Sequence, residues 1–109
     1  MGVAAEPPRL GSLQSTVLRL YVAGDAPNSV LARSNLNRLL ENVDPGAYRL
    51  EVIDCLREPL RAIADGVLVT PTLLRVEPQP QRTVVGSLSA PERVAEVIDL
   101  KPSRRDGTD

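Results

Sequence analysis

The chain has 109 residues, of which 42% are hydrophobic and 25% charged, enough for one hydrophobic core and too few for two domains of ordinary size. Lysine plus arginine (13) nearly balance aspartate plus glutamate (14), so no strong field favours nucleic acid or an anionic membrane surface. The absence of histidine and the single cysteine exclude histidine catalysis, an internal disulfide and a CxxC pair. We therefore expect no catalytic residues, no cofactor and no metal.

Both ends of the chain differ in composition from its middle. Residues 1–15 lack the charged start and apolar run of a secretory signal and are expected to be a flexible extension. Residues 101–109 alternate in charge and are expected to be a disordered tail. The folded domain is then 16–100, and a lone Cys55 fits a reducing cytoplasm. Such a cysteine is more often a small, partly buried hydrophobe than a redox sensor.

The first half of this domain predicts a strand, a helix and a second strand. Residues 16–23 are almost all apolar, as in a strand buried on both faces. A helix follows to about residue 43, with Asp25 as a cap and Pro27 in its first turn. Its apolar face comprises Ala32, Leu36, Leu39, Leu40 and Val43.

The segment after this helix predicts a second strand and a short second helix. Residues 48–53 alternate with period two, and a right-handed crossover makes this strand parallel to the first. Residues 56–65 read as a short helix entered near Pro59 and ended by Gly66. Its expected apolar face is Leu60, Ile63 and Ala64.

The last third predicts a hairpin and a final helix. Residues 67–76 are strand-like on both sides of Pro71, so the strand should begin at Thr70 or Thr72. Residues 82–85 form its antiparallel partner, and Gly86 ends it. Residues 89–92 have the pattern of a capping box that opens a helix, with Val94, Val97 and Ile98 inward. The predicted fold class is α/β with the order βαβαββα.

This order is that of thioredoxin, and three strings resemble that fold. Asp25-Ala26-Pro27-Asn28 stands where redox thioredoxins carry Cys-x-Pro-Cys, so thiol exchange is not expected. Residues 70–74, Thr-Pro-Thr-Leu-Leu, resemble the segment whose proline is cis in that fold, which implies a cis Pro71. Residues 85–89, Val-Gly-Ser-Leu-Ser, resemble the run before its last helix.

A narrower resemblance covers residues 18–100. Leu20-Tyr21-Val22-Ala23-Gly24, Pro27-Asn28-Ser29, Val52-Ile53-Asp54, residues 70–73 and residues 86–89 resemble runs of the KaiB family of circadian clock proteins. The resemblance implies a non-catalytic protein that binds the hexameric ATPase KaiC, and in some systems captures KaiA, to time a phosphorylation cycle. It also implies a metamorphic protein with two folds, a tetrameric ground state ordered βαββααβ and a thioredoxin-like state that binds partners.

The residues expected to govern that choice of fold lie around the last helix and the cis-proline position: Pro71, Gly86, Ser87, Ser89 and Pro91. In the ground-state fold the segment after Gly86 must supply a strand, where Pro91 removes a ladder donor. The capping box favours the helix, by about 1 kcal/mol for a cap. We therefore expect a thioredoxin-like monomer at rest, with the tetramer as the alternative.

The thioredoxin resemblance implies that the second strand is the outer one of the parallel pair. Its edge is the candidate partner surface, because unpaired backbone groups there accept a partner strand. For two other sets of polar residues, a partner contact competes with a simpler explanation. Solvation alone explains the exposed Arg33 and Arg38, and formation of a helix cap and turn explains Asp25 and Asn28. Alternative functions are a sensor module like those of KaiC-linked histidine kinases, a stress regulator and a thiol oxidoreductase, which needs a cysteine at position 25 or 28. The edge residues are Tyr48, Arg49, Leu50, Glu51, Val52 and Ile53.

Overall fold

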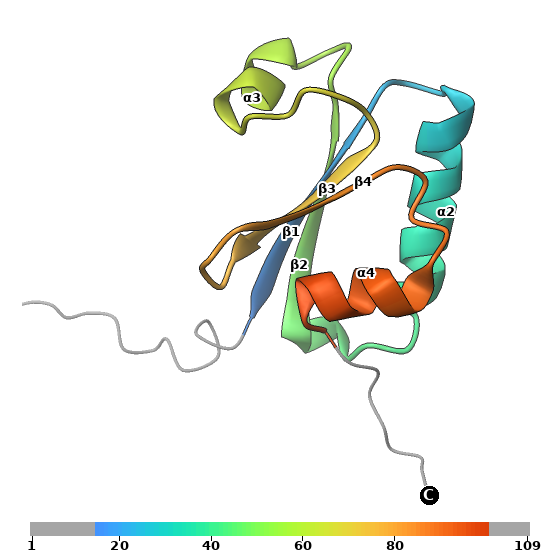
Figure 1. Cartoon of the computed structure of the whole chain (residues 1–109), viewed down its shortest axis with the longest axis vertical. Helices are drawn as coiled ribbons and strands as arrows, with labels where there is room; N and C mark the ends of the chain where they lie inside the picture. Colours follow the sequence, from blue (N-terminus) through green and yellow to red (C-terminus); the bar gives the residue numbers. More distant parts are fainter. Residues whose placement is uncertain (1–14, 101–109) are drawn as a thin grey trace, which may run out of the picture.

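The computed structural model describes residues 15–100, so the expected extension, apart from Ser15, and the expected tail lie outside the described part. The elements follow the predicted order βαβαββα, with one added 3-10 turn (Figure 1). They are β1 (Thr16–Val22), α2 (Pro27–Leu40), η2 (Pro45–Ala47), β2 (Tyr48–Asp54), α3 (Pro59–Ala64), β3 (Thr72–Glu77), β4 (Arg82–Val85) and α4 (Pro91–Ile98).

The four strands form one mixed sheet in the order β2-β1-β3-β4. β1 and β2 are parallel, in a register that runs from Thr16 opposite Tyr48 to Val22 opposite Asp54. β3 is antiparallel to β1, and β4 is antiparallel to β3. The predicted position of β2 at the edge of the sheet is confirmed.

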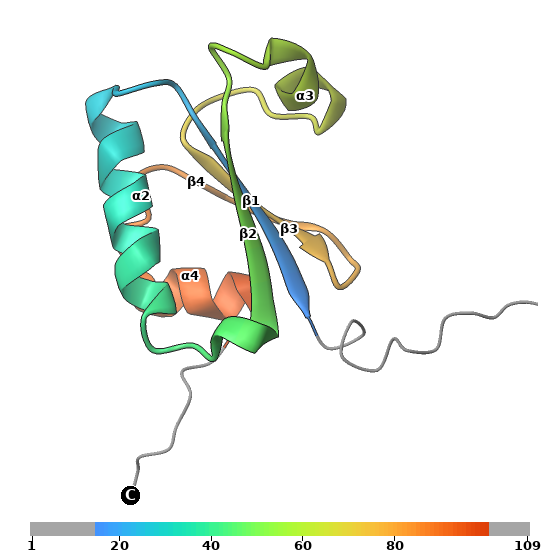
Figure 2. The same cartoon turned by 180° about the vertical axis from the view of Figure 1, so that it is seen from behind.

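α2 and α4 cover one face of this sheet and build the larger core (Figures 1 and 2). The apolar alternation of β1 supplies its sheet side, and the helices supply their predicted apolar faces. α2 ends at Leu40, three residues before the predicted end, but Val43 still packs into the core. The buried residues of this core include Leu18, Leu20, Val22, Ala32, Leu36, Leu40, Leu73, Val94 and Ile98.

Within residues 15–100, the opposite face of the sheet is covered only at one end, by α3 and its flanking loops (Figure 2). A second, smaller core lies there, made of Tyr21, Ile53, Ala62 and Leu74. The rest of this face, toward the beginning of β1, carries Arg19, Arg49 and Glu51. One sheet therefore has a fully packed face and a mostly open one.

The predicted caps of α2 and α4 are wrong. α2 begins after Ala26 and α4 after Ala90, and no side chain accepts a capping bond at either end. Both alanines precede a proline, which disfavours helical dihedrals at the preceding residue and moves the cap position to the alanine. Asp25 and Ser89 therefore lie one residue too early. Glu92 takes the second helical position, where it cannot close a capping box with Ser89.

The predicted orientation of α3 is also wrong. Leu60 and Ile63 are 77% and 70% exposed, Ala64 is exposed too, and only Ala62 of this helix is buried. The pattern of exposure along β2 reverses near its last residues, next to α3. Val52 is 41% exposed there, whereas Ile53 is fully buried. α3 buries Ile53 on its side of the sheet, whereas Val52 lies on the α2 and α4 side but outside the larger core.

The hairpin segment lies where the sequence placed it. The Thr70–Pro71 peptide bond is cis, and β3 begins at Thr72. The Thr72 hydroxyl donates to the Val69 carbonyl oxygen at 2.6 Å, and the Gly86 N–H donates to the Pro71 carbonyl oxygen at 2.9 Å. These bonds join the loop before β3 to the end of β4.

Candidate protein-binding site

The free edge of β2 is the first candidate surface. Arg49 and Glu51 are exposed on the open face, and Tyr48 and Leu50 are half-buried against the larger core. Val52 is exposed at the end of the strand, but Ile53 is fully buried and cannot meet a partner with its side chain. The edge therefore offers its outer backbone groups and five of the six predicted side chains.

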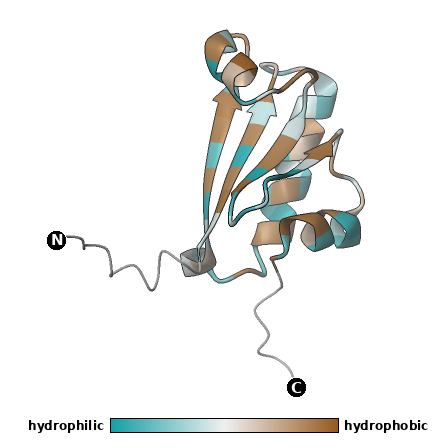
Figure 3. Ribbon diagram, turned by 60° about the vertical axis from the view of Figure 1, so that its left-hand side comes forward, coloured by the Kyte–Doolittle hydropathy of each residue, from teal (hydrophilic) through white to brown (hydrophobic). Residues whose placement is uncertain are grey.

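A second candidate surface lies beyond the end of the sheet, in the connection between β2 and β3 (Figure 3). We call it the apolar end. Its large side chains are 50–93% exposed, whereas single exposed apolar residues are the usual case on a soluble surface. They are Leu56, Leu60, Ile63, Leu68 and Val69. This surface was not predicted, because the spacing of Leu60 and Ile63 indicates a buried helix face.

A tight turn at Asp54 fixes the beginning of the apolar end. The Asp54 carboxylate accepts from the backbone N–H groups of Gly24 and Leu56, each at 3.0 Å. Gly24 has φ +53°, and a Cβ there would lie 3.2 Å from Leu56 Cδ1. Glycine thus provides the backbone conformation and the space that let Leu56 lie over the end of β1.

A cluster of polar side chains joins α3 to the open face. The Tyr21 hydroxyl donates to the Asp65 carboxylate, which also accepts from Arg19 Nη1 at 2.9 Å. Arg61 forms a two-bonded pair with Glu51, with Nη1 to Oε2 at 2.6 Å and Nη2 to Oε1 at 2.9 Å. The five residues come from β1, β2 and the α3 segment, so their contacts could not be predicted from local sequence.

The electrostatics of this cluster favour its present charge state. Burial, and then the hydrogen bond to Asp65, raise the pKa of Tyr21 to about 12. Burial alone would raise the pKa of Asp65, but hydrogen bonds from Tyr21 and Arg19 lower it. The bond from Arg61 lowers the pKa of Glu51. The cluster thus keeps a neutral phenol and two carboxylates between paired arginines at neutral pH.

The remaining predicted residues do not form a chemical site. Asp25 and Asn28 are exposed at the start of α2, and Cys55 lies apart from them at the end of β2. Burial, and then the charge of Asp54, raise the pKa of the Cys55 thiol, which opposes thiolate chemistry. Within residues 15–100 no group of acidic or cysteine side chains could hold a metal. No helix in the described part is long and apolar enough to cross a membrane.

The residues proposed to govern the choice of fold surround the start of α4. Asn35 of α2 donates from Nδ2 to the Ser87 carbonyl oxygen at 2.8 Å, which ties this loop to α2. Gly86 and Leu88 have positive φ, 109° and 61°, and Leu88 is buried in the larger core. A groove of about 270 Å³ beside them is lined by Leu39, Leu88, Ser89 and Pro91, among others.

Comparison with known proteins settles the family. Residues 19–100 match the family model described as the KaiB domain. The chain belongs to the KaiB family. The circadian clock oscillator protein KaiB of Acaryochloris marina is 49% identical over 92 residues, which cover 84% of this chain and 88% of the relative.

Solved structures agree on the thioredoxin-like fold. The N-terminal domain of Synechococcus elongatus SasA matches with a TM-score of 0.66 and 23% identity, over 87% of this chain and 88% of that chain. Mitochondrial thioredoxin 3 of Saccharomyces cerevisiae matches with a TM-score of 0.65 and 15% identity, over 83% and 82% of the two chains. The expected α/β thioredoxin-like fold of this KaiB-family chain is therefore confirmed.

Proposed function

We propose that this chain is a non-catalytic clock or regulatory protein that binds a KaiC-type ATPase and modulates its phosphorylation cycle in the cytoplasm. The observation that carries the proposal is the match of residues 19–100 to the KaiB domain, together with 49% identity to a circadian clock oscillator protein KaiB. KaiA or a KaiC-linked histidine kinase is the further partner class. The absence of a thiol at positions 25 and 28 supports a binding role, because thiol exchange needs a thiolate there.

The apolar end is the surface that we propose for the ATPase. Interfaces draw most of their binding energy from a few apolar anchors that become fully desolvated. Leu60, Ile63 and Leu68 have the exposure that such anchors need before binding. The free β2 edge, from Tyr48 to Val52, is the proposed site for strand addition by a second partner.

Co-elution with a cognate KaiC-type ATPase tests this proposal. The chain should co-elute with the phosphorylated ATPase ring and change the rate at which the ring loses or gains phosphate. Failure to bind every cognate KaiC-type ATPase of the host would overturn the proposal and leave the family and fold. Reduction of an insulin-type disulfide faster than by a Cys55→Ser variant would instead indicate an oxidoreductase.

We further propose that the chain can switch to the βαββααβ fold and that the thioredoxin-like monomer is its resting state. Pro91 supports this preference, because it fits the first position of α4 but would remove a ladder donor from a strand. The capping box predicted at Ser89 does not contribute to this preference, because no side chain caps α4. Pro91 and the loop contacts of residues 86–88 therefore support the proposed preference.

Backbone chemical shifts and native mass measure which fold is populated. Helical shifts over residues 94–98 with a monomer mass are expected. Strand-like shifts over these residues with a tetramer mass would show that the other fold is the resting state. Pro91→Arg should increase the tetramer fraction, and an unchanged fraction would mean that another segment sets the balance.

A further inference from the structure

α3 is held on the sheet with one of its less apolar sides inward. Its six residues are too few to form a stable helix alone, so tertiary contacts must determine how it lies. The spacing of Leu60, Ile63 and Ala64 predicts that this side should be buried, yet all three are exposed. Something other than apolar pattern selects the observed rotation of the helix.

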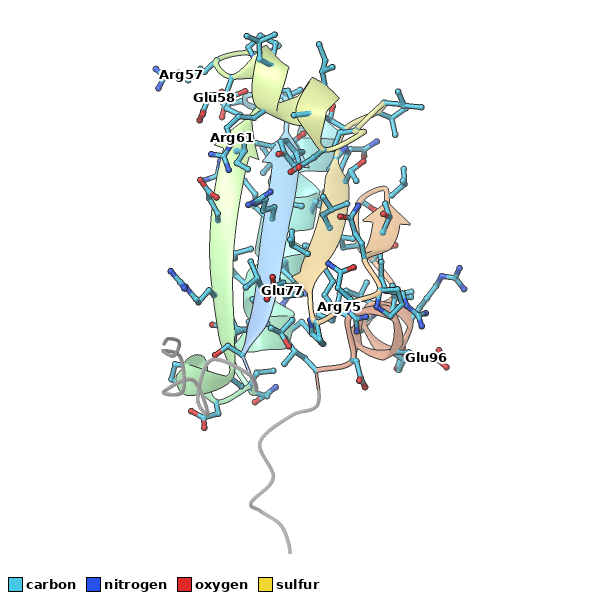
Figure 4. The ribbon with its side chains drawn as sticks, turned by 90° about the vertical axis from the view of Figure 1, so that its left-hand side faces the viewer. Arg57, Glu58, Arg61, Arg75, Glu77 and Glu96 are labelled. Carbon is cyan, nitrogen blue, oxygen red and sulfur yellow. The ribbon has the colours of Figure 1, made fainter. Side chains whose placement is uncertain are left out.

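The contacts on the inner side of α3 identify what selects it. Ala62 packs with Tyr21, Ile53 and Leu74, and its small side chain allows the helix to approach the sheet closely. Arg61, next in sequence, reaches down over β2 to Glu51 (Figure 4). Successive residues of a helix are about 100° apart, so turning Leu60 and Ile63 inward would withdraw Arg61 from Glu51.

Glu51 occupies a central place in these contacts. Besides its two bonds with Arg61, it lies 3.8 Å from Arg19 Nε, while Arg19 Nη1 holds Asp65 just beyond the end of α3. A bidentate guanidinium–carboxylate pair has a fixed planar geometry that a single surface charge pair lacks. The pair therefore constrains the direction in which Arg61, and with it the whole helix, can point.

We infer that Glu51 and Arg61 are positioning residues that set the rotation of α3 and thereby keep Leu60 and Ile63 exposed on the apolar end. The inference rests on the proposed function, because it assigns to this ion pair the presentation of the proposed ATPase-binding surface. Neither residue needs to touch the partner. Loss of the pair should let the helix turn toward the rotation that its apolar pattern favours.

The test compares Glu51→Gln, Arg61→Gln and the swapped variant Glu51→Arg with Arg61→Glu. A soluble paramagnetic agent reports by NMR how accessible the methyl groups of Leu60 and Ile63 are in the free protein. Accessibility should fall several-fold in each single variant. The swapped variant should regain part of it, since its new arginine lies beside Arg19 and its new glutamate beside Glu58. Arg57→Gln is the matched control, since Arg57 lies just before the same helix, points away from the sheet and should leave accessibility unchanged (Figure 4).

Each outcome separates the inference from the proposed function. Unchanged methyl accessibility in both single variants, with folding verified by amide spectra, would overturn the positioning role. An equal fall in Arg57→Gln would also contradict it, because Arg57 is not part of the ion pair. If accessibility responds as expected while affinity for the ATPase ring stays the same, the positioning role stands and the proposed binding surface fails. About tenfold weaker binding in the single variants, with part of the affinity regained in the swap, supports both.

Discussion

The two faces of the sheet are built on different principles. The face under α2 and α4 is closed by a large aliphatic core of buried side chains, to which β1, α2 and α4 each contribute their inward residues. The face under α3 has a core of four residues and relies on a polar cluster around Asp65 and Glu51. The first face therefore holds the fold together, whereas the second face presents an apolar surface without burying it.

Truncation in the larger core should have the largest effect on stability. Leu36→Ala removes a fully buried side chain of α2 and should lower the free energy of unfolding by about 2–5 kcal/mol. Leu31→Ala on the same helix is the control, because Leu31 is 50% exposed and should cost less than about 0.5 kcal/mol. Urea titrations measure both values, and equal costs would contradict the described packing of α2.

Removal of one polar group from the smaller core should have the next largest effect on stability. Tyr21→Phe removes the bond to the Asp65 carboxylate and should cost about 1.5–3 kcal/mol, a range typical of bonds to charged groups. The pKa of Tyr21 is raised to about 12, so the unfolded chain ionises first and stability should fall as pH rises from about 10 to 12.

The phenylalanine variant should lose this alkaline decline, since it has no phenol at position 21. Tyr48→Phe is the matched control and should keep the decline, because Tyr21 is still present. Stability measured by urea titration at several alkaline pH values decides the matter. A decline that persists unchanged in Tyr21→Phe would show that another group causes it.

The smallest expected effects on the free energy of unfolding are those of two serine substitutions near helix starts. Ser29→Ala removes a hydroxyl of a buried residue that accepts from the Ala23 N–H at 3.0 Å and should cost about 1–3 kcal/mol. Ser89→Ala should cost less than about 0.5 kcal/mol, because Ser89 is exposed and does not cap α4. A cost of about 1 kcal/mol for Ser89→Ala would instead show that Ser89 caps α4.

Much of the first face could be predicted from the sequence. The 16–23 run, the spacing of Ala32, Leu36 and Leu40, and the inward Val94 and Ile98 are local patterns that also describe the packed structure. The misplaced caps had a usable signal, since Ala-Pro at 26–27 and at 90–91 already shifts the cap to the alanine.

The second face could not be predicted in the same way. The bonds of Arg19 and Tyr21 to Asp65 join residues more than 40 positions apart. The spacing of Leu60 and Ile63 predicted a buried helix face. This prediction failed because the apolar pattern of a short helix carries no information about long-range polar contacts that compete with it. The apolar end was therefore missed, although the edge position of β2 followed correctly from the resemblance to the thioredoxin order.

A binding isotherm of the chain with its cognate KaiC-type ATPase ring tests the central claim most directly. Wild type should bind saturably, and Leu60→Asp should bind at least about tenfold more weakly, because it places a charge in the proposed desolvated contact. Leu60 is 77% exposed, so the variant should remain folded, and Leu31→Asp on α2 should bind like wild type. Equal affinity of Leu60→Asp and wild type would contradict the apolar end as the docking surface, and no binding of wild type would contradict the proposed function itself.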